Sequence, residues 1–281
     1  MGRTRWGCGV VVGAVMLAGC GGAAAAPSSP TAAATPSGTV ARVMPDAENV
    51  RGTYVVVTGD ASESRLRHTV QAADQAARWV TQTWGDVWRG RARVVVYAPR
   101  SMPEFLALGG GSSEGDQVSA TTTVAGAVVL SPELSTEVTP EGQVVVLAHE
   151  LTHVALHQAG LTHTRRWVIE GSAELTAYRP TGLSVARAAP QVAVLVRSGR
   201  SPAGPPTDEA FSGSSDDLQI SYQQAYTWCR FLGQKFGLPA FKRFVKQADR
   251  GATETAFRDQ FHTTPAGLAD TYRTWLRTTV S

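Results

Sequence analysis

Apolar residues recur along the chain with helical spacing in some stretches and with strand spacing in others. Between residues 62 and 84 they return every three or four positions, which predicts one long helix with a single buried stripe. Residues 52–58 and 92–97 are short, rich in β-branched side chains and bounded by Gly, Asp or Pro, as strands are. Together these stretches predict a strand, helix, strand unit.

The rest of the chain extends this pattern. Residues 118–124 and 125–130 predict two short strands or one bent strand, and residues 125–130 would offer an edge against which an extended peptide can pair. Helical spacing then returns at 140–160, 167–177, 191–197, 220–236, 240–248, 254–261 and 265–278. We therefore expect an α+β fold with a small mixed sheet in the N-terminal half and a helical C-terminal half.

The N-terminus has the pattern of a secretion leader. Two arginines precede an apolar run that is too short to span a membrane and that ends in Leu17-Ala18-Gly19-Cys20. This ending resembles the cleavage site of bacterial lipoproteins. The resemblance implies that Cys20 is lipidated, becomes the mature N-terminus and anchors the protein on the outer face of a bacterial cell membrane. An ordinary signal peptide with an incidental cysteine is the alternative.

Composition divides the chain after the leader, which we place at residues 1–20. Residues 21–45 are mainly Gly, Ala, Ser, Thr and Pro, with too few large apolar side chains to fold, and predict a disordered tether. Residues 46–281 are long and apolar enough to form one domain. The net charge of +3 is small and no basic stripe interleaved with aromatics occurs, so nucleic acid is not expected as a partner. Cys229 lies in a helical pattern and is expected in the core.

One predicted helix carries two histidines on one face. It should begin after the capping residue Thr139, with Pro140 in its first turn, and end at Gly160. His149 and His153 are four positions apart within it, so both imidazoles point off the same face and can share a metal.

Glu150 directly follows the first histidine. A carboxylate at this place can take a proton from zinc-bound water without binding the metal itself. The residues from His149 to His153 thus match the HExxH pattern of zinc peptidases. A solvated helix face with two unrelated histidines is the alternative. The apolar flanks argue against it, because unpaired titratable groups on a buried helix are costly.

A zinc site needs a third protein ligand. His157 continues the spacing, but three successive positions on one helix span about 12 Å, too far for a single ion. The pattern HExxHxxGxxH fails because Leu156 and Ala159 stand where Gly and His are required. His163, in a predicted turn, remains an alternative, and Glu170 is the stronger candidate.

The segment around Glu170 carries a family resemblance. Trp167-Val168-Ile169-Glu170-Gly171-Ser172-Ala173, together with the HExxH pattern, resembles the gluzincins, in particular the aminopeptidase-N-like and the small bacterial peptidase-MA-like domains. The resemblance implies a zincin-like fold in which His149, His153 and Glu170 bind one Zn²⁺ per chain. It spans roughly residues 118–278, and the spacing between its two motifs is a little shorter than in the aminopeptidases.

The same resemblance suggests two further residues. Glu174, one turn after the third ligand, would orient a ligand histidine through its other ring nitrogen, and a merely solvated carboxylate is the alternative. Related enzymes stabilise the oxyanion with a Tyr or His from a downstream helix. Tyr222 is our first choice for this role, and Tyr226, Tyr178 and His163 compete with it.

These observations predict a membrane-tethered zinc metallopeptidase that faces the outside of the cell and acts on a peptide or protein, with Glu150 as general base. The runner-up is a zincin-like binding or assembly lipoprotein that cleaves nothing. The intact Glu150 disfavours it, because an inactive relative would be free to lose the base. The sequence indicates neither the substrate nor the oligomeric state.

Overall fold

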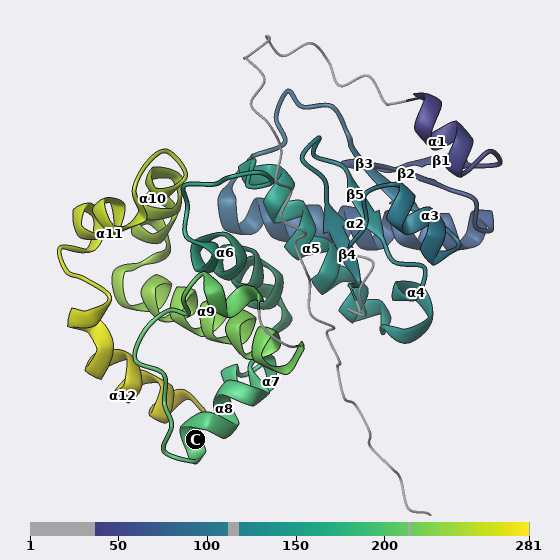
Figure 1. Ribbon diagram of the computed structural model, residues 1–281. Coiled ribbons are helices and arrows are strands. Elements are labelled where there is room, and N and C mark those ends of the chain that lie inside the picture. The colour runs from purple at the N-terminus through teal and green to yellow at the C-terminus, as the bar shows by residue number, and fades with distance from the viewer. Residues whose placement is uncertain (1–36, 112–117, 213–214, 281) are drawn as a thin grey trace, which may run out of the picture.

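The chain folds into a sheet-containing N-terminal half and a helical C-terminal half. The computed structural model describes residues 37–111, 118–212 and 215–280 (Figure 1). The fold is α+β, with the sheet at the right of Figure 1 and the C-terminal helices at the left, as predicted. The leader and Cys20 lie outside the described residues. No described helix combines the length and the apolar character that a bilayer span requires.

Five strands form one mixed sheet. Their order across it is β1 (Glu48–Arg51), β2 (Val55–Gly59), β3 (Val94–Ala98), β5 (Val128–Leu130) and β4 (Ala120–Thr122). The three inner strands are parallel, and both edge strands are antiparallel to their neighbours. Helix α2 (Glu63–Trp84) connects β2 to β3, which confirms the predicted strand, helix, strand unit. β1 was not predicted, because its polar and mostly exposed residues carry no strand pattern.

The edge strand beside the candidate site is β4. We expected residues 125–130 to provide this edge, and that prediction was wrong, because β5 is paired with β3 on one side and with β4 on the other. The chain turns back at Gly126, whose φ of 79° lies in the left-handed region. This turn makes two strands of the segment and puts the earlier one, β4, at the edge.

Different helices cover the two faces of the sheet. Helix α2 and helix α5 (Pro140–Leu156) pack against each other and against the face formed by alternate strand residues such as Val57 and Val96. These two valines are completely buried. Helix α5 is therefore fixed by the main core and also borders β4.

The outer face is covered by α1 (Ser37–Val43) and α3 (Met102–Ala107). Val40 and Met44 pack with Tyr97 of β3 in a separate apolar cluster. They are only 8% and 1% exposed. The predicted end of the disordered tether at residue 45 was thus wrong: few apolar residues suffice here, because the sheet supplies the surface that they cover.

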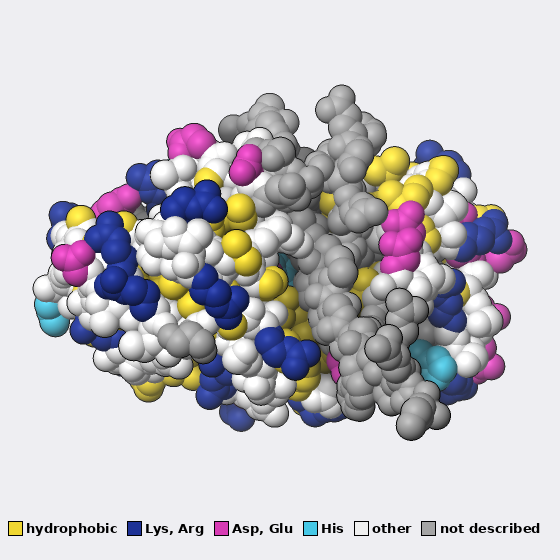
Figure 2. Space-filling model, turned by 90° about the horizontal axis from the view of Figure 1, so that it is seen from below, with side chains coloured by type: hydrophobic (Ala, Val, Ile, Leu, Met, Phe, Trp, Pro, Cys, Tyr) yellow, Lys and Arg dark blue, Asp and Glu magenta, His cyan; other side chains and the backbone are white. Residues whose placement is uncertain are grey.

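The remaining helices are α4 (Leu134–Glu137), α6 (Arg166–Tyr178), α7 (Val185–Ala188), α8 (Pro190–Arg197), α9 (Ser215–Phe236), α10 (Leu238–Ala248), α11 (Thr253–Phe261) and α12 (Ala269–Val280). Helix α6 runs very close to α9, because a Cβ at Gly171 would lie 2.7 Å from the carbonyl oxygen of Ala225. Cys229 of α9 is completely buried, as predicted. On the face in Figure 2, Lys and Arg side chains lie scattered over the helical half among uncharged ones.

Candidate metal centre

Helix α5 is closed at both ends by local interactions. At its start, the hydroxyl of Thr139 accepts a hydrogen bond of 3.2 Å from the backbone N–H of Gly142. The helix ends at Leu156, earlier than the predicted Gly160, because His157 adopts a left-handed conformation with φ of 55°. A left-handed residue directly after the last turn stops a helix.

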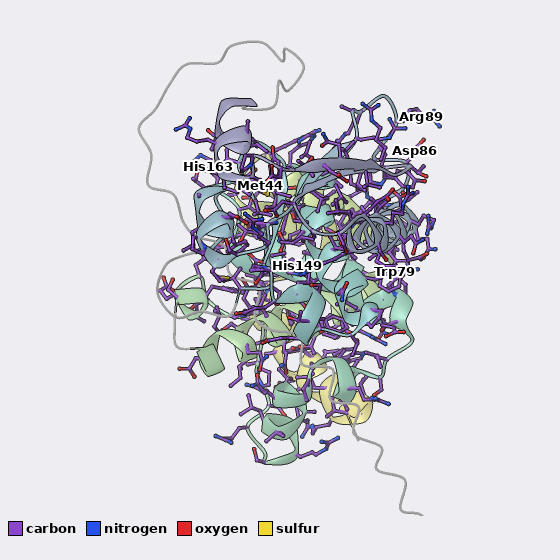
Figure 3. The ribbon with its side chains drawn as sticks, turned by 90° about the vertical axis from the view of Figure 1, so that its right-hand side faces the viewer. Met44, Trp79, Asp86, Arg89, His149 and His163 are labelled. Carbon is purple, nitrogen blue, oxygen red and sulfur yellow. The ribbon has the colours of Figure 1, made fainter. Side chains whose placement is uncertain are left out.

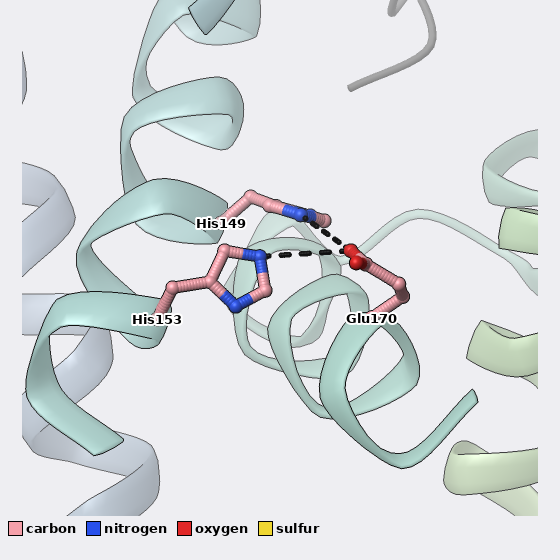
Figure 4. A group of neighbouring side chains, drawn as sticks. All are labelled: His149, His153 and Glu170. Atoms are coloured by element: carbon pink, nitrogen blue, oxygen red, sulfur yellow. Dashed lines mark ion pairs between the residues drawn. The ribbon is translucent and has the colours of Figure 1, made fainter. Parts of the chain in front are cut away.

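Three side chains meet where α5 faces α6 (Figure 4). Nε2 of His149 lies 3.3 Å from Oε2 of Glu170, and Nε2 of His153 lies 3.6 Å from the same oxygen. One potential ligand atom from each residue lies within 4.8 Å of the other two, and no side chain of the three is more than 2% exposed. This group could hold a metal ion.

The polar atoms of the group support this interpretation. Nε2 of His149, Nε2 of His153 and both carboxylate oxygens of Glu170 are buried and have no hydrogen-bond partner among the described residues. Buried polar atoms are rarely left without partners, because their desolvation is then uncompensated. Two imidazole nitrogens and a carboxylate that face one another are a ligand set for a divalent cation.

Electrostatics couple the same residues. Burial would lower the pKa of His149, but the carboxylates of Glu170, Glu174 and Glu150 raise it to about 10. Burial would raise the pKa of Glu170, but its contacts with His149 and His153 lower it to about 2. Without a metal the group therefore holds opposite charges, and a bound cation would replace the proton on His149.

A second side chain contacts each of the two histidines. Oε1 of Glu174 lies 3.0 Å from Nδ1 of His149, so the structure brings these two residues together in the way the sequence suggested. Oε1 of Gln158 lies 3.1 Å from Nδ1 of His153. Gln158 was not predicted, because its side chain reaches His153 only through the left-handed turn at His157. An amide residue two positions after the end of the helix was the one available signal.

Glu150 is completely buried, and its two oxygens differ. Oε2 accepts a hydrogen bond of 2.6 Å from the hydroxyl of Thr122 on the edge strand β4. Oε1 has no hydrogen-bond partner in the described part of the chain. Thr122 was not predicted either, because it is 28 residues away in sequence and meets Glu150 only through the packing of β4 on α5.

Tyr222 of α9 lies beside the group. Its ring centroid is 6.2 Å from that of His149, and its buried hydroxyl has no hydrogen-bond partner among the described residues. Burial raises its pKa well above the usual value, so the hydroxyl stays protonated and can donate. Tyr226 instead accepts a hydrogen bond of 2.5 Å from Arg230 and packs against Tyr178.

The other two histidines considered are not in the group. His157 and His163 are both exposed, and neither belongs to the metal-binding set found within the described residues. Figure 3 shows His163 well apart from His149. The structure thus brings together His149, His153 and Glu170 and leaves His163 outside.

Comparison with known protein families and with curated proteins finds no match for this chain. The gluzincin resemblance therefore stays a prediction. It rests on the two sequence motifs between His149 and Glu174.

Proposed function

We propose that this chain is a zinc-dependent metallopeptidase with a zincin-like fold, held outside the cell membrane through a lipid on Cys20. The observation that carries the proposal is the meeting of His149, His153 and Glu170 with Glu150 beside them. Two imidazoles and one carboxylate are typical ligands of catalytic zinc, whereas Ca²⁺ and Mg²⁺ prefer oxygen ligands alone. Three protein ligands also leave one position of a tetrahedral ion for water.

Each residue around the proposed ligands would have a different role in peptide hydrolysis. The chemistry that zinc supplies when bound is Lewis acidity, which lowers the pKa of a coordinated water to about 7. The unpartnered Oε1 of Glu150 would accept the proton of the attacking water, while Thr122 holds Oε2 in place. Glu150 would then pass this proton to the leaving amine, and the hydroxyl of Tyr222 would donate to the oxyanion.

The edge strand β4 supports a peptide as substrate. Within the described residues it pairs only with β5, and it carries Thr122, which contacts Glu150. An extended peptide that adds to this edge would pass next to the proposed base.

The replacement Glu150→Gln tests the proposal. It keeps the size of the side chain and its hydrogen bond from Thr122 but removes the proton acceptor. Zinc content and thermal stability should change little, whereas cleavage of a peptide library should fall by a factor of about 10²–10⁴. Glu141→Gln, at an exposed position in the first turn of the same helix, is the matched control and should cleave normally.

Two outcomes count against the proposal. If Glu150→Gln cleaves as fast as the unaltered protein, Glu150 is not the base. If the unaltered protein binds zinc but cleaves nothing in the library, a binding or assembly lipoprotein becomes the better interpretation. Glu170→Ala checks the ligand set separately, because it should lose most of the zinc.

A further inference from the structure

Gln158 connects the two helices of the metal centre. It is 2% exposed, and its amide lies between His153 of α5 and Ser172 of α6. Its Nε2 donates to the hydroxyl oxygen of Ser172 at 3.1 Å, and its Oε1 lies 3.1 Å from Nδ1 of His153. A buried amide with both ends engaged holds whatever it touches in a fixed orientation.

Ser172 sets the direction of this hydrogen-bond chain. Its hydroxyl donates to the backbone carbonyl of Ile169 at 2.9 Å, which uses its single proton. The oxygen of Ser172 can then only accept, so the amide NH₂ of Gln158 must face it. The carbonyl of Gln158 consequently faces His153, and Nδ1 of that ring must carry the hydrogen.

Backbone hydrogen bonds also fix the position of Gln158. After the left-handed residue His157, the N–H of Gln158 donates to the carbonyl oxygen of His153 at 2.9 Å. The guanidinium of Arg91 donates to the carbonyl oxygen of Ala155 at 3.2 Å and further secures this helix end. The turn that closes α5 therefore also folds Gln158 back toward the ligand histidine.

We propose that Gln158 and Ser172 are positioning residues of the metal centre. They fix the tautomer and the ring orientation of His153, so that its Nε2 keeps a lone pair directed toward Glu170 and a divalent cation. A hydrogen bond at one ring nitrogen selects the other nitrogen as ligand. The inference rests on the metal centre of the proposed function and does not depend on peptide hydrolysis.

Zinc affinity of the full chain, measured by competition with a chromogenic chelator, tests this role. Gln158→Met keeps the length of the side chain but removes both hydrogen bonds, so zinc should bind about 10–100-fold more weakly. Gln158→Glu retains an acceptor for Nδ1–H but cannot donate to the oxygen of Ser172, so its zinc affinity should lie between those of Gln158→Met and the unaltered protein.

Ser172→Ala tests the direction of the hydrogen bonds from Gln158 to Ser172 and from His153 to Gln158. It should also weaken zinc binding, and combined with Gln158→Met it should add little, because both changes break one network. Ser221→Ala is the matched control, since Ser221 is also buried on a helix and donates to a backbone carbonyl at 2.9 Å. It should leave zinc affinity unchanged.

A spectroscopic measurement separates positioning from a general structural effect. In ¹⁵N NMR of the zinc-loaded protein, Nδ1–H of His153 should give a slowly exchanging signal, and Ser172→Ala should accelerate its exchange even if Gln158→Met does not fold. If folded Gln158→Met binds zinc as tightly as the unaltered protein, the positioning role is overturned and the metal centre is not. Absence of zinc binding by the unaltered protein overturns the metal centre as well.

Discussion

Glu150 and Glu170 are both completely buried, yet their surroundings give them different chemistry. The oxygens of Glu170 face the two histidines, whereas Glu150 is held through one oxygen by Thr122. A carboxylate surrounded by other ligand atoms suits metal binding, and one with a single free oxygen suits proton transfer. In the proposed function, the neighbouring side chains would thus decide which glutamate binds the metal and which transfers protons.

Asp249 carries a half-buried carboxyl, far along the chain from the proposed metal ligands. It caps the C-terminus of α10, and its Oδ1 has no hydrogen-bond partner in the described part of the chain. Burial raises its pKa from 3.8 to about 7, despite an opposing hydrogen bond with Thr164. The partial negative charge of the helix C-terminus also disfavours an ionised carboxylate there.

This pKa makes stability depend on pH. Between pH 3.8 and about 7 the folded state keeps a proton that the unfolded state has released. The free energy of unfolding should therefore fall as the pH rises through this window, by at most about 1.4 kcal/mol per pH unit. Asp249→Asn should remove this contribution and be more stable than the unaltered protein above pH 7, as measured by urea unfolding.

A matched variant separates this effect from ordinary surface charge. Asp270→Asn alters a side chain that is 97% exposed and should leave the pH dependence unchanged. If Asp249→Asn and the unaltered protein lose stability in parallel across the window, Asp249 is not the titrating group.

The sequence could predict the proposed ligand residues, but it could not predict every residue that orients the side chains of the site. His149 and His153 were found because spacing along a helix fixes which side chains share a face, whereas Glu170 and Glu174 were found through the resemblance of their segment to the gluzincins. Gln158 and Thr122 were missed, because one depends on a left-handed turn and the other on packing between a strand and a helix. Neither contact leaves a periodic signal.

At the level of elements, the distance between α6 and α9 is set by Gly171. A Cβ at this position would lie 2.5 Å from Sγ of Cys229 and 2.7 Å from the carbonyl oxygen of Ala225. Gly171→Ala should therefore force the helices apart and destabilise the protein by about 1–3 kcal/mol. Because Glu170 is the adjacent residue, zinc affinity should fall as well.

Gly233 on α9 provides the comparison. A Cβ there would have no heavy atom within 4 Å, so Gly233→Ala should gain helix propensity and stabilise the protein by about 0.5–1 kcal/mol. Thermal and chemical unfolding of both variants measure the difference. Equal effects of the two substitutions would show that close packing at Gly171 does not matter.

Elements with a regular repeat of apolar residues were predicted well, and elements that depend on tertiary contacts were not. The long helix α2 follows directly from its repeating apolar stripe. Helix α1 was taken for part of a tether, because only the sheet face beneath Val40 and Met44 makes so few apolar residues sufficient. The end of α5 at His157 depends on a residue that rarely adopts a left-handed conformation, so Gly160 looked like the better stop.

Across the whole molecule, the candidate metal centre joins two differently supported helices. Helix α5 packs on α2 and β4, whereas α6 packs on α9 in the helical half. A ligand that binds only the folded state stabilises it by mass action. Zinc should therefore raise the free energy of unfolding by about 1.4 kcal/mol for each tenfold excess over its dissociation constant, and a chelator should reverse the gain.

Thermal unfolding at increasing zinc concentration measures this linkage. The Glu170→Ala variant is the control and should show little dependence on zinc. If neither zinc nor a chelator changes the melting temperature of the unaltered protein, there is no metal site between these helices.

The three proposed ligand residues all lie in one short stretch of chain, between His149 and Glu170. Loop-closure entropy is small for such a stretch, so contacts between α5 and α6 are local and can form quickly. Pairing of β2 with β3 instead requires closure across the whole of α2. We therefore expect the pair of helices that contains every proposed ligand to assemble more readily than the sheet, so that the proposed ligand set can come together early in folding.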